Sequence, residues 1–188
     1  MGTATTLERE VKLSFDTAEA AREAVLAAGA TPLHGRRLQE DALLDDAANA
    51  LRERGCALRI RMENGKSRIT LKGPIQDSVM KLRDEFETVV GDGVLLLRVF
   101  EELGYQVWFR YEKYREEFAH EDVIVAVDET PVGVFVEIEG SESGITTMAA
   151  AMGRTPDDYI LDSYRALFLK RAAVLGLRGT DMVFDAPQ

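Results

Sequence analysis

The chain has 188 residues, of which 30% are charged and 46% hydrophobic, and its formal net charge is −10. These values are typical of a folded globular protein and predict a single domain over residues 1–188. The acidic balance excludes a general nucleic-acid-binding surface, which needs excess positive charge. It does not exclude a small polyanion, because binding of such a ligand depends on local charge.

The sequence also indicates the cellular location of the protein. No apolar run approaches the roughly 20 residues of a membrane span, and no basic and apolar leader is recognisable. The single cysteine, Cys56, excludes an internal disulfide framework. We therefore expect a cytoplasmic protein that does not bind membranes, while a monomer and a homodimer both remain open.

Strand and helix patterns alternate along the chain. Eight strands are predicted, over residues 7–13, 33–45, 57–63, 67–72, 81–90, 106–118, 122–129 and 132–139. Asn64-Gly65, between the third and the fourth strand, is a strong hairpin signal. Helices are predicted over residues 17–29, 47–54, 92–103, 143–152 and 155–175, the last one capped by Thr155-Pro156-Asp157.

The first predicted strand carries charged side chains on one face. Because side chains alternate along a strand, Glu8, Glu10 and Lys12 share a face, opposite apolar residues. Two carboxylates beside a lysine in one row are costly unless a divalent cation binds the carboxylates and an anion binds the lysine. For this strand taken alone, an ordinary solvated face is the simpler interpretation.

The same pairing of charged or polar residues at positions i and i+2 recurs on five more strands. Its members are Arg59 and Arg61, Thr70 and Lys72, Arg83 with Glu85 and Glu87, Lys113 and Arg115, and Glu137 and Glu139. Six such strands in one domain indicate a closed sheet with a charged interior and an apolar outside covered by helices. The predicted fold is α+β: an eight-stranded antiparallel β-barrel that encloses a tunnel, with helices packed outside.

The order of these motifs resembles that of the CYTH proteins, also called triphosphate tunnel metalloenzymes. The resemblance starts at Glu8-x-Glu10-x-Lys12 and covers nearly the whole chain in the family's order, through residues 58–61, 70–74, 83–87, 113–115, 127–128, 133–139 and 162–164. A single ExExK pattern is weak evidence, whereas the ordered set is specific. The family includes class IV adenylyl cyclases, thiamine triphosphatases and inorganic triphosphatases.

This resemblance implies a divalent-metal-dependent reaction of a small triphosphate, and the charged residues suit that chemistry. Cationic side chains bind phosphate oxygens, and the candidates are Lys12, Arg59, Arg61, Lys72, Arg83, Lys113 and Arg115. Carboxylates hold Mg²⁺ or Mn²⁺; for two such ions the candidates are Glu8, Glu10, Glu137 and Glu139, then Glu85, Glu87 and Asp128. Lys12, Glu10 and Glu137 are the predicted catalytic residues.

Several interpretations stay open at this point. Asp128 also fits a turn before Pro131, and Arg83 also fits a solvated strand residue. Phe109, Tyr111 and Phe135 have the inward parity, for which core packing is preferred over contact with a base. Residues 39–45 break their alternation at Ala42-Leu43-Leu44, which leaves a substrate contact from this segment in doubt.

Three alternative functions are compatible with such a tunnel. Hydrolysis of inorganic triphosphate is preferred because nothing in the sequence demands a base pocket. Conversion of ATP to cyclic AMP and pyrophosphate by a class IV adenylyl cyclase is the close alternative. A non-catalytic module that binds polyphosphate or a nucleotide comes from a different class. No Walker A, GxGxxG, HExxH or CxxC motif supports another enzyme class.

Overall fold

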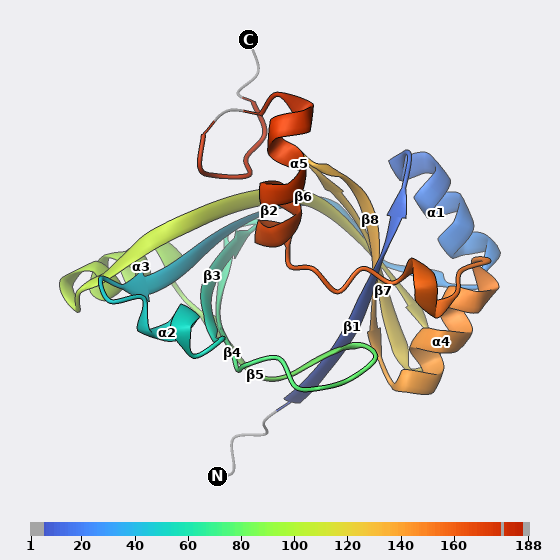
Figure 1. Ribbon diagram of the computed structural model, residues 1–188, viewed down its shortest axis with the longest axis horizontal. Helices are drawn as coiled ribbons and strands as arrows, with labels where there is room; N and C mark the ends of the chain where they lie inside the picture. Colours follow the sequence, from blue (N-terminus) through green and yellow to red (C-terminus); the bar gives the residue numbers. More distant parts are fainter. Residues whose placement is uncertain (1–5, 178, 186–188) are drawn as a thin grey trace.

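The computed structural model describes residues 6–177 and 179–185. In this part of the chain, eight antiparallel strands close into a barrel in the order β1-β5-β4-β3-β2-β6-β7-β8 (Figure 1). The strands are β1 (Thr6–Phe15), β2 (Thr31–Asp46), β3 (Ala57–Glu63), β4 (Lys66–Lys72), β5 (Lys81–Val90), β6 (Tyr105–His120), β7 (Val123–Thr130) and β8 (Gly133–Gly140). The predicted closed barrel is confirmed.

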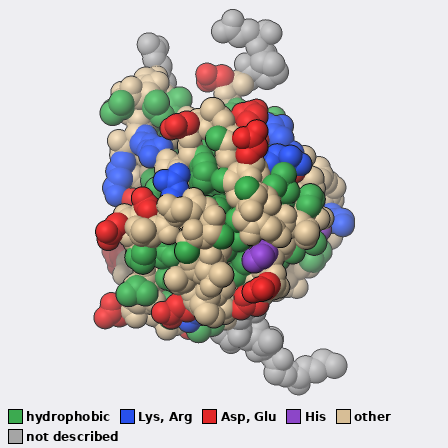
Figure 2. Space-filling view, turned by 90° about the vertical axis from the view of Figure 1, so that its right-hand side faces the viewer, with side chains coloured by type: hydrophobic (Ala, Val, Ile, Leu, Met, Phe, Trp, Pro, Cys, Tyr) green, Lys and Arg blue, Asp and Glu red, His purple; other side chains and the backbone are tan. Residues whose placement is uncertain are grey.

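Helices pack against the outside of the barrel. They are α1 (Ala18–Ala27), α2 (Ala50–Glu53), α3 (Gly93–Glu102), α4 (Glu142–Ala151), the 3₁₀ helix η1 (Pro156–Asp158) and α5 (Tyr164–Leu175). Figure 1 shows α1 and α4 on one side of the barrel and α3 on the other. Figure 2 looks onto the side that bears α1 and α4, where charged side chains of both signs lie among hydrophobic ones. None of the described helices is long and apolar enough to cross a membrane.

The prediction of one continuous helix over residues 155–175 is wrong. A single 3₁₀ turn ends at Asp158, residues 159–163 are not helical, and α5 begins at Tyr164. The chain leaves the helical path because the backbone of Ile160 pairs with that of Lys12 on β1. A new helix then starts at Ser163, whose hydroxyl accepts the backbone N–H of Ala166.

Strand alternation separates two environments. Outward-facing residues such as Val11, Val125 and Ile138 are buried under α1 and α4, in the larger of two apolar clusters on the outside of the barrel. The smaller cluster, which includes Ile60 and Leu97, lies under α3. The predicted apolar outside covered by helices is therefore confirmed, and the inward positions are left for polar side chains.

One part of the barrel interior is aromatic instead. Phe109 and Phe135 are fully buried there, and Phe168 of α5 lies 5.9 Å from Phe109 between ring centroids. Tyr111 also belongs to this cluster, with its ring centroid 6.0 Å from that of Tyr164. The preferred interpretation, core packing, is confirmed for Phe109 and Phe135, whereas Tyr111 packs against Tyr164 of α5 and also lines the barrel cavity.

Candidate active site

The barrel encloses a cavity of about 820 Å³ lined by side chains from all eight strands. This volume lies within the roughly 300–1,000 Å³ that is usual for small-molecule sites. Every residue proposed above to bind phosphate or metal lines the cavity except Asp128. The structure therefore gathers residues from the whole chain around one space, as the paired charges predicted.

Lys12 lies at the centre of a buried group of ion pairs. Its Nζ is 3.0 Å from a carboxylate oxygen of Glu10 and 3.1 Å from one of Glu137, and its side chain is 2% exposed. Burial alone would lower the pKa of Lys12, but the two carboxylates outweigh it and raise this pKa. Burial would likewise raise the pKa of Glu10, but Lys12 and then Lys81 lower it well below its usual range. Lys12 therefore bridges the other two predicted catalytic residues, Glu10 and Glu137.

A second group of ion pairs centres on Asp128. Its carboxylate is fully buried and accepts hydrogen bonds from Lys113 Nζ at 2.8 Å and from Arg115 Nε at 2.6 Å. Arg115 also contacts Glu137, which joins this group to Lys12. Burial, and next the charge of Arg115, lower the pKa of Lys113 to about 8. Asp128 lies behind the cavity wall, where its carboxylate holds Lys113 and Arg115. The alternative of a turn residue is wrong because Asp128 lies within β7, paired with Phe135 of β8.

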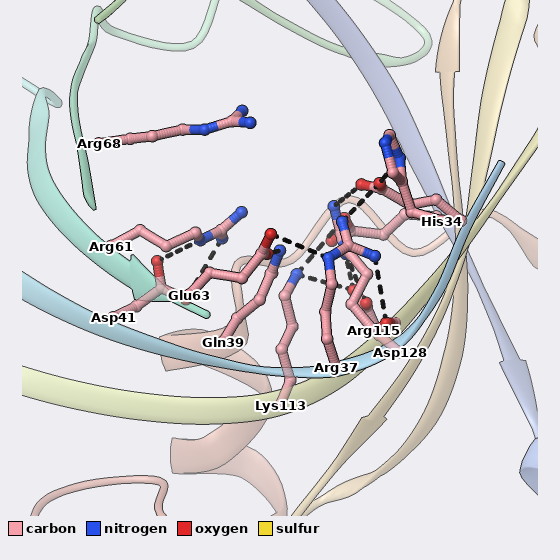
Figure 3. A network of polar contacts seen from close by, with 12 residues as sticks. His34, Arg37, Gln39, Asp41, Arg61, Glu63, Arg68, Lys113, Arg115 and Asp128 are labelled. Carbon is pink, nitrogen blue, oxygen red and sulfur yellow. Dashed lines mark hydrogen bonds and ion pairs between the residues drawn. The ribbon is translucent and has the colours of Figure 1, made fainter. Parts of the chain in front are cut away.

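The opposite wall carries Arg59 and Arg61 of β3. Arg61 makes two hydrogen bonds, at 2.8 and 3.2 Å, to the buried carboxylate of Asp41 (Figure 3). Arg59 donates to Thr70 at 3.1 Å and lies 3.5 Å from both Asp41 and Glu87. Both guanidinium groups line the cavity, and their planar forks suit bidentate contact with phosphate.

A third group contains mainly carboxylates. Lys72 contacts Glu8 and lies 2.8 Å from Glu85, and Glu139 lines the cavity beside them. Burial, followed by the charge of Glu10, raises the pKa of Glu8. Burial, followed by the charge of Glu8, raises the pKa of Glu139 to about 7. Repulsion among these carboxylates is therefore only partly offset by Lys72.

This third group is the one whose carboxylates could hold a divalent cation. Oε2 of Glu8 is buried and has no hydrogen-bond partner among the residues that the structure describes, and a cation would relieve the repulsion between Glu8 and Glu139. Within the described residues, no three carboxylate, histidine or cysteine side chains converge on a preformed metal position. The reason is that Lys12, Lys72 and Lys81 take up carboxylate oxygens in this arrangement.

Arg83 and Glu87 contribute less directly to the cavity. The guanidinium of Arg83 donates to the backbone oxygen atoms of Gly73 at 2.9 Å and Gly55 at 3.1 Å. Arg83 thus ties two loops to β5 and is buried rather than solvated. Glu87 is shared between Arg68 at 3.0 Å and Thr70 at 2.9 Å.

Sequence reasoning missed several cavity residues. Lys81 contacts Glu10 and has the same strand parity as Arg83, so alternation on β5 could have found it. Gln39, which lines the cavity, and Asp41, which lies behind Arg61, escape prediction because the alternation of their strand fades at Leu43, where the β2–β6 register shifts. A further group centres on Arg37; it contains His34, Gln39 and Glu63, which Figure 3 labels, and also Glu117.

Comparison with known proteins identifies the family. Residues 6–154 match the CYTH domain, so the chain belongs to the CYTH domain family. A protein of Methanocaldococcus jannaschii named "Putative adenylate cyclase MJ0240" is 31% identical over 140 residues, which cover 74% of this chain and 79% of that protein. The resemblance read from the ordered motifs is therefore confirmed.

Solved structures share the fold. A "putative adenylate cyclase" of Vibrio parahaemolyticus has a TM-score of 0.75 at 18% identity, with 88% of this chain and 99% of that chain covered. "Putative adenylyl cyclase HpAC1" of Hippeastrum, described as having a dominant triphosphatase activity, has a TM-score of 0.65 at 20% identity, with 87% and 95% covered. At these identities the likeness shows the barrel fold alone.

Proposed function

We propose that this protein is a divalent-metal-dependent triphosphatase that hydrolyses inorganic triphosphate inside the barrel. One observation carries the proposal: the cavity is lined by buried and partly buried cations from β1, β3, β4, β5 and β6, each held by acidic or polar neighbours. A short polyanion with several negative charges fits such a lining, since positioned cations stabilise the charge of phosphoryl transfer. Family membership supports a triphosphate substrate, and the Hippeastrum description supports hydrolysis.

The side chains of the cavity have two proposed roles, phosphate binding and metal binding. Arg59, Arg61 and Arg115 bind phosphate oxygens through guanidinium forks, and Lys12 and Lys113 act as point charges. Glu8 and Glu139, with Glu85 and Glu10 nearby, would hold Mg²⁺ or Mn²⁺, and we propose two such ions. When bound, these ions would neutralise phosphate oxygens and lower the pKa of a bound water.

The chemical step needs a base and a leaving group. The cations around Glu137 outweigh its burial and lower its pKa well below the usual range, so its carboxylate is ionised, is a weak base, and holds Lys12 and Arg115 in position. The attacking water therefore gives its proton to bulk water, which is the base. Oxygen of that water bonds to the terminal phosphorus, and the bridging P–O bond breaks. Orthophosphate and pyrophosphate result, and Lys12 stabilises the charge that develops on the leaving oxygen.

Adenylyl cyclase activity is the second candidate, and two observations favour it. The Methanocaldococcus jannaschii relative carries that name, and the cavity also has apolar and aromatic lining at Leu43, Trp108 and Tyr111, against which a base could pack. In that reaction the ribose 3′-hydroxyl would attack the α-phosphorus and release pyrophosphate.

Product analysis separates these candidates. The protein is incubated with tripolyphosphate or ATP, each with Mg²⁺ or Mn²⁺, and orthophosphate, pyrophosphate and cyclic AMP are measured separately, with Glu137→Gln as the inactive control. Orthophosphate and pyrophosphate from tripolyphosphate support the triphosphatase, and cyclic AMP from ATP supports the cyclase. Tight binding of either compound without any product would instead show a non-catalytic binding module.

A further inference from the structure

Tyr164, the first residue of α5, enters the candidate active site from outside the barrel strands. Its hydroxyl donates a 2.5 Å hydrogen bond to Oδ2 of Asp128, and its residue surface is 7% exposed. The centroid of its ring is 5.3 Å from Nζ of Lys12 and 4.8 Å from Nζ of Lys113. One side chain thus contacts both cation groups described above.

The local chain fixes Tyr164 in this position. Ile160 exchanges two backbone hydrogen bonds with Lys12, of 3.1 and 2.9 Å, so the segment before α5 is anchored to β1 beside the site. Ser163 caps the first turn of α5. The ring of Tyr164 then packs edge-on against Phe135, at 5.9 Å between centroids. The direction of the hydroxyl is therefore set by backbone pairing, capping and aromatic packing together.

Asp128 is the acceptor that connects Tyr164 to the cavity. Its Oδ2 accepts from Lys113, Arg115 and Tyr164. Asp128 itself is fully buried and does not line the cavity, whereas Lys113 and Arg115 do. Whatever holds this carboxylate therefore also determines how the two cations are presented to a ligand.

We propose that Tyr164 is a positioning residue for phosphate binding, a role that rests on the proposed function. Its hydroxyl occupies one acceptor direction of Asp128 and leaves the remaining ones to Lys113 and Arg115. Its ring meanwhile supports the ammonium groups of Lys12 and Lys113 through cation–π contact. Without the hydroxyl, the freed acceptor direction of Asp128 attracts the Lys113 ammonium away from the cavity, and triphosphate loses part of its binding.

The test compares two tyrosine variants. Tyr164→Phe removes the hydroxyl and keeps the ring, and Tyr159→Phe makes the same change five residues earlier, where the side chain packs against the outer core. Calorimetry measures binding of tripolyphosphate with Mg²⁺ to the full chain, and a melting curve of each variant without ligand reports stability. We expect Tyr164→Phe to bind about tenfold more weakly, or ~1.4 kcal/mol, and Tyr159→Phe to bind like the wild type.

The possible outcomes are distinct. A Tyr164→Phe protein that melts lower but binds tripolyphosphate with wild-type affinity overturns the proposal, since a purely structural role would give that result. A wild type that does not bind tripolyphosphate refutes the proposed function itself. Asp128→Asn gives a second check: adding Tyr164→Phe to it should weaken binding little further, because Tyr164 acts through Asp128, and full additivity contradicts this route. If Asp128→Asn does not fold, the comparison of the two tyrosine variants decides alone.

Discussion

Divalent-metal affinity should rise with pH because of Glu139. Its pKa of about 7 means that about a tenth of these carboxyl groups are ionised at pH 6 and about nine-tenths at pH 8. A metal ligand must be deprotonated, so binding that displaces this one proton should strengthen about tenfold between these pH values and then level off. Glu139→Gln cannot ionise and should show weaker binding with a much flatter pH dependence.

The assay is titration of the metal-free protein with Mn²⁺, followed by electron paramagnetic resonance of the free ion, at pH 6, 7 and 8. Glu142→Gln is the matched control, because Glu142 is an exposed residue of α4 outside the cavity lining. It should keep the wild-type pH dependence. Equal Mn²⁺ affinity at pH 6 and pH 8 in the wild type, or an unchanged profile in Glu139→Gln, would refute the assignment of Glu139 to the metal group.

Three further predictions follow from the same charges. Without metal, the free energy of unfolding should fall as the pH rises from about 4.5 to about 7, because the folded state holds the Glu139 proton and the unfolded state releases it; urea unfolding of wild type and Glu139→Gln should show a smaller fall in the variant. Activity should vanish with EDTA and return with Mg²⁺ or Mn²⁺, and it should also be lost in Glu10→Gln. Full turnover in excess chelator would refute the proposed metal dependence. Arg61→Gln should weaken tripolyphosphate binding by ~1.5–3 kcal/mol, whereas Arg9→Gln, on the outward parity of β1, should change it little; equal losses in calorimetry would mean that the inside–outside assignment is wrong.

The barrel could be predicted because the alternation of charged and apolar residues, which determines it, recurs on strand after strand of the sequence. Alternation of charged and apolar residues on strands such as β1 and β8 fixes which face is buried, and the same parity recurs on neighbouring strands. This repetition predicts that the sheet closes into a barrel, since the charged faces of six strands can line one common interior only in a closed sheet. Thirteen of the predicted site residues accordingly line one cavity, and Asp128 lies just behind it.

Features that depend on long-range contacts could not be read in this way. The position of α5 depends on backbone pairing between Ile160 and Lys12, and backbone groups carry no sequence signal. The contact of Tyr164 with Asp128 follows from that pairing. Asp45 shares the parity of Asp41, yet its carboxylate accepts the backbone N–H groups of Leu51 and Arg52 in α2, because the register shift after Leu43 changes its surroundings.

Thermal unfolding with and without a phosphate chain tests the central claim, a cavity built for triphosphate, most directly. An interior crowded with charges gains stability when a matching ligand binds, by ~2.7 kcal/mol at a ligand concentration 100-fold above the dissociation constant. We expect tripolyphosphate with Mg²⁺ to raise the melting temperature by several degrees. Orthophosphate with Mg²⁺, at matched ionic strength, should raise it much less, and a triple variant of Glu8, Glu10 and Lys12 should lose the difference. Identical melting temperatures of the wild type with tripolyphosphate and with orthophosphate would contradict the account.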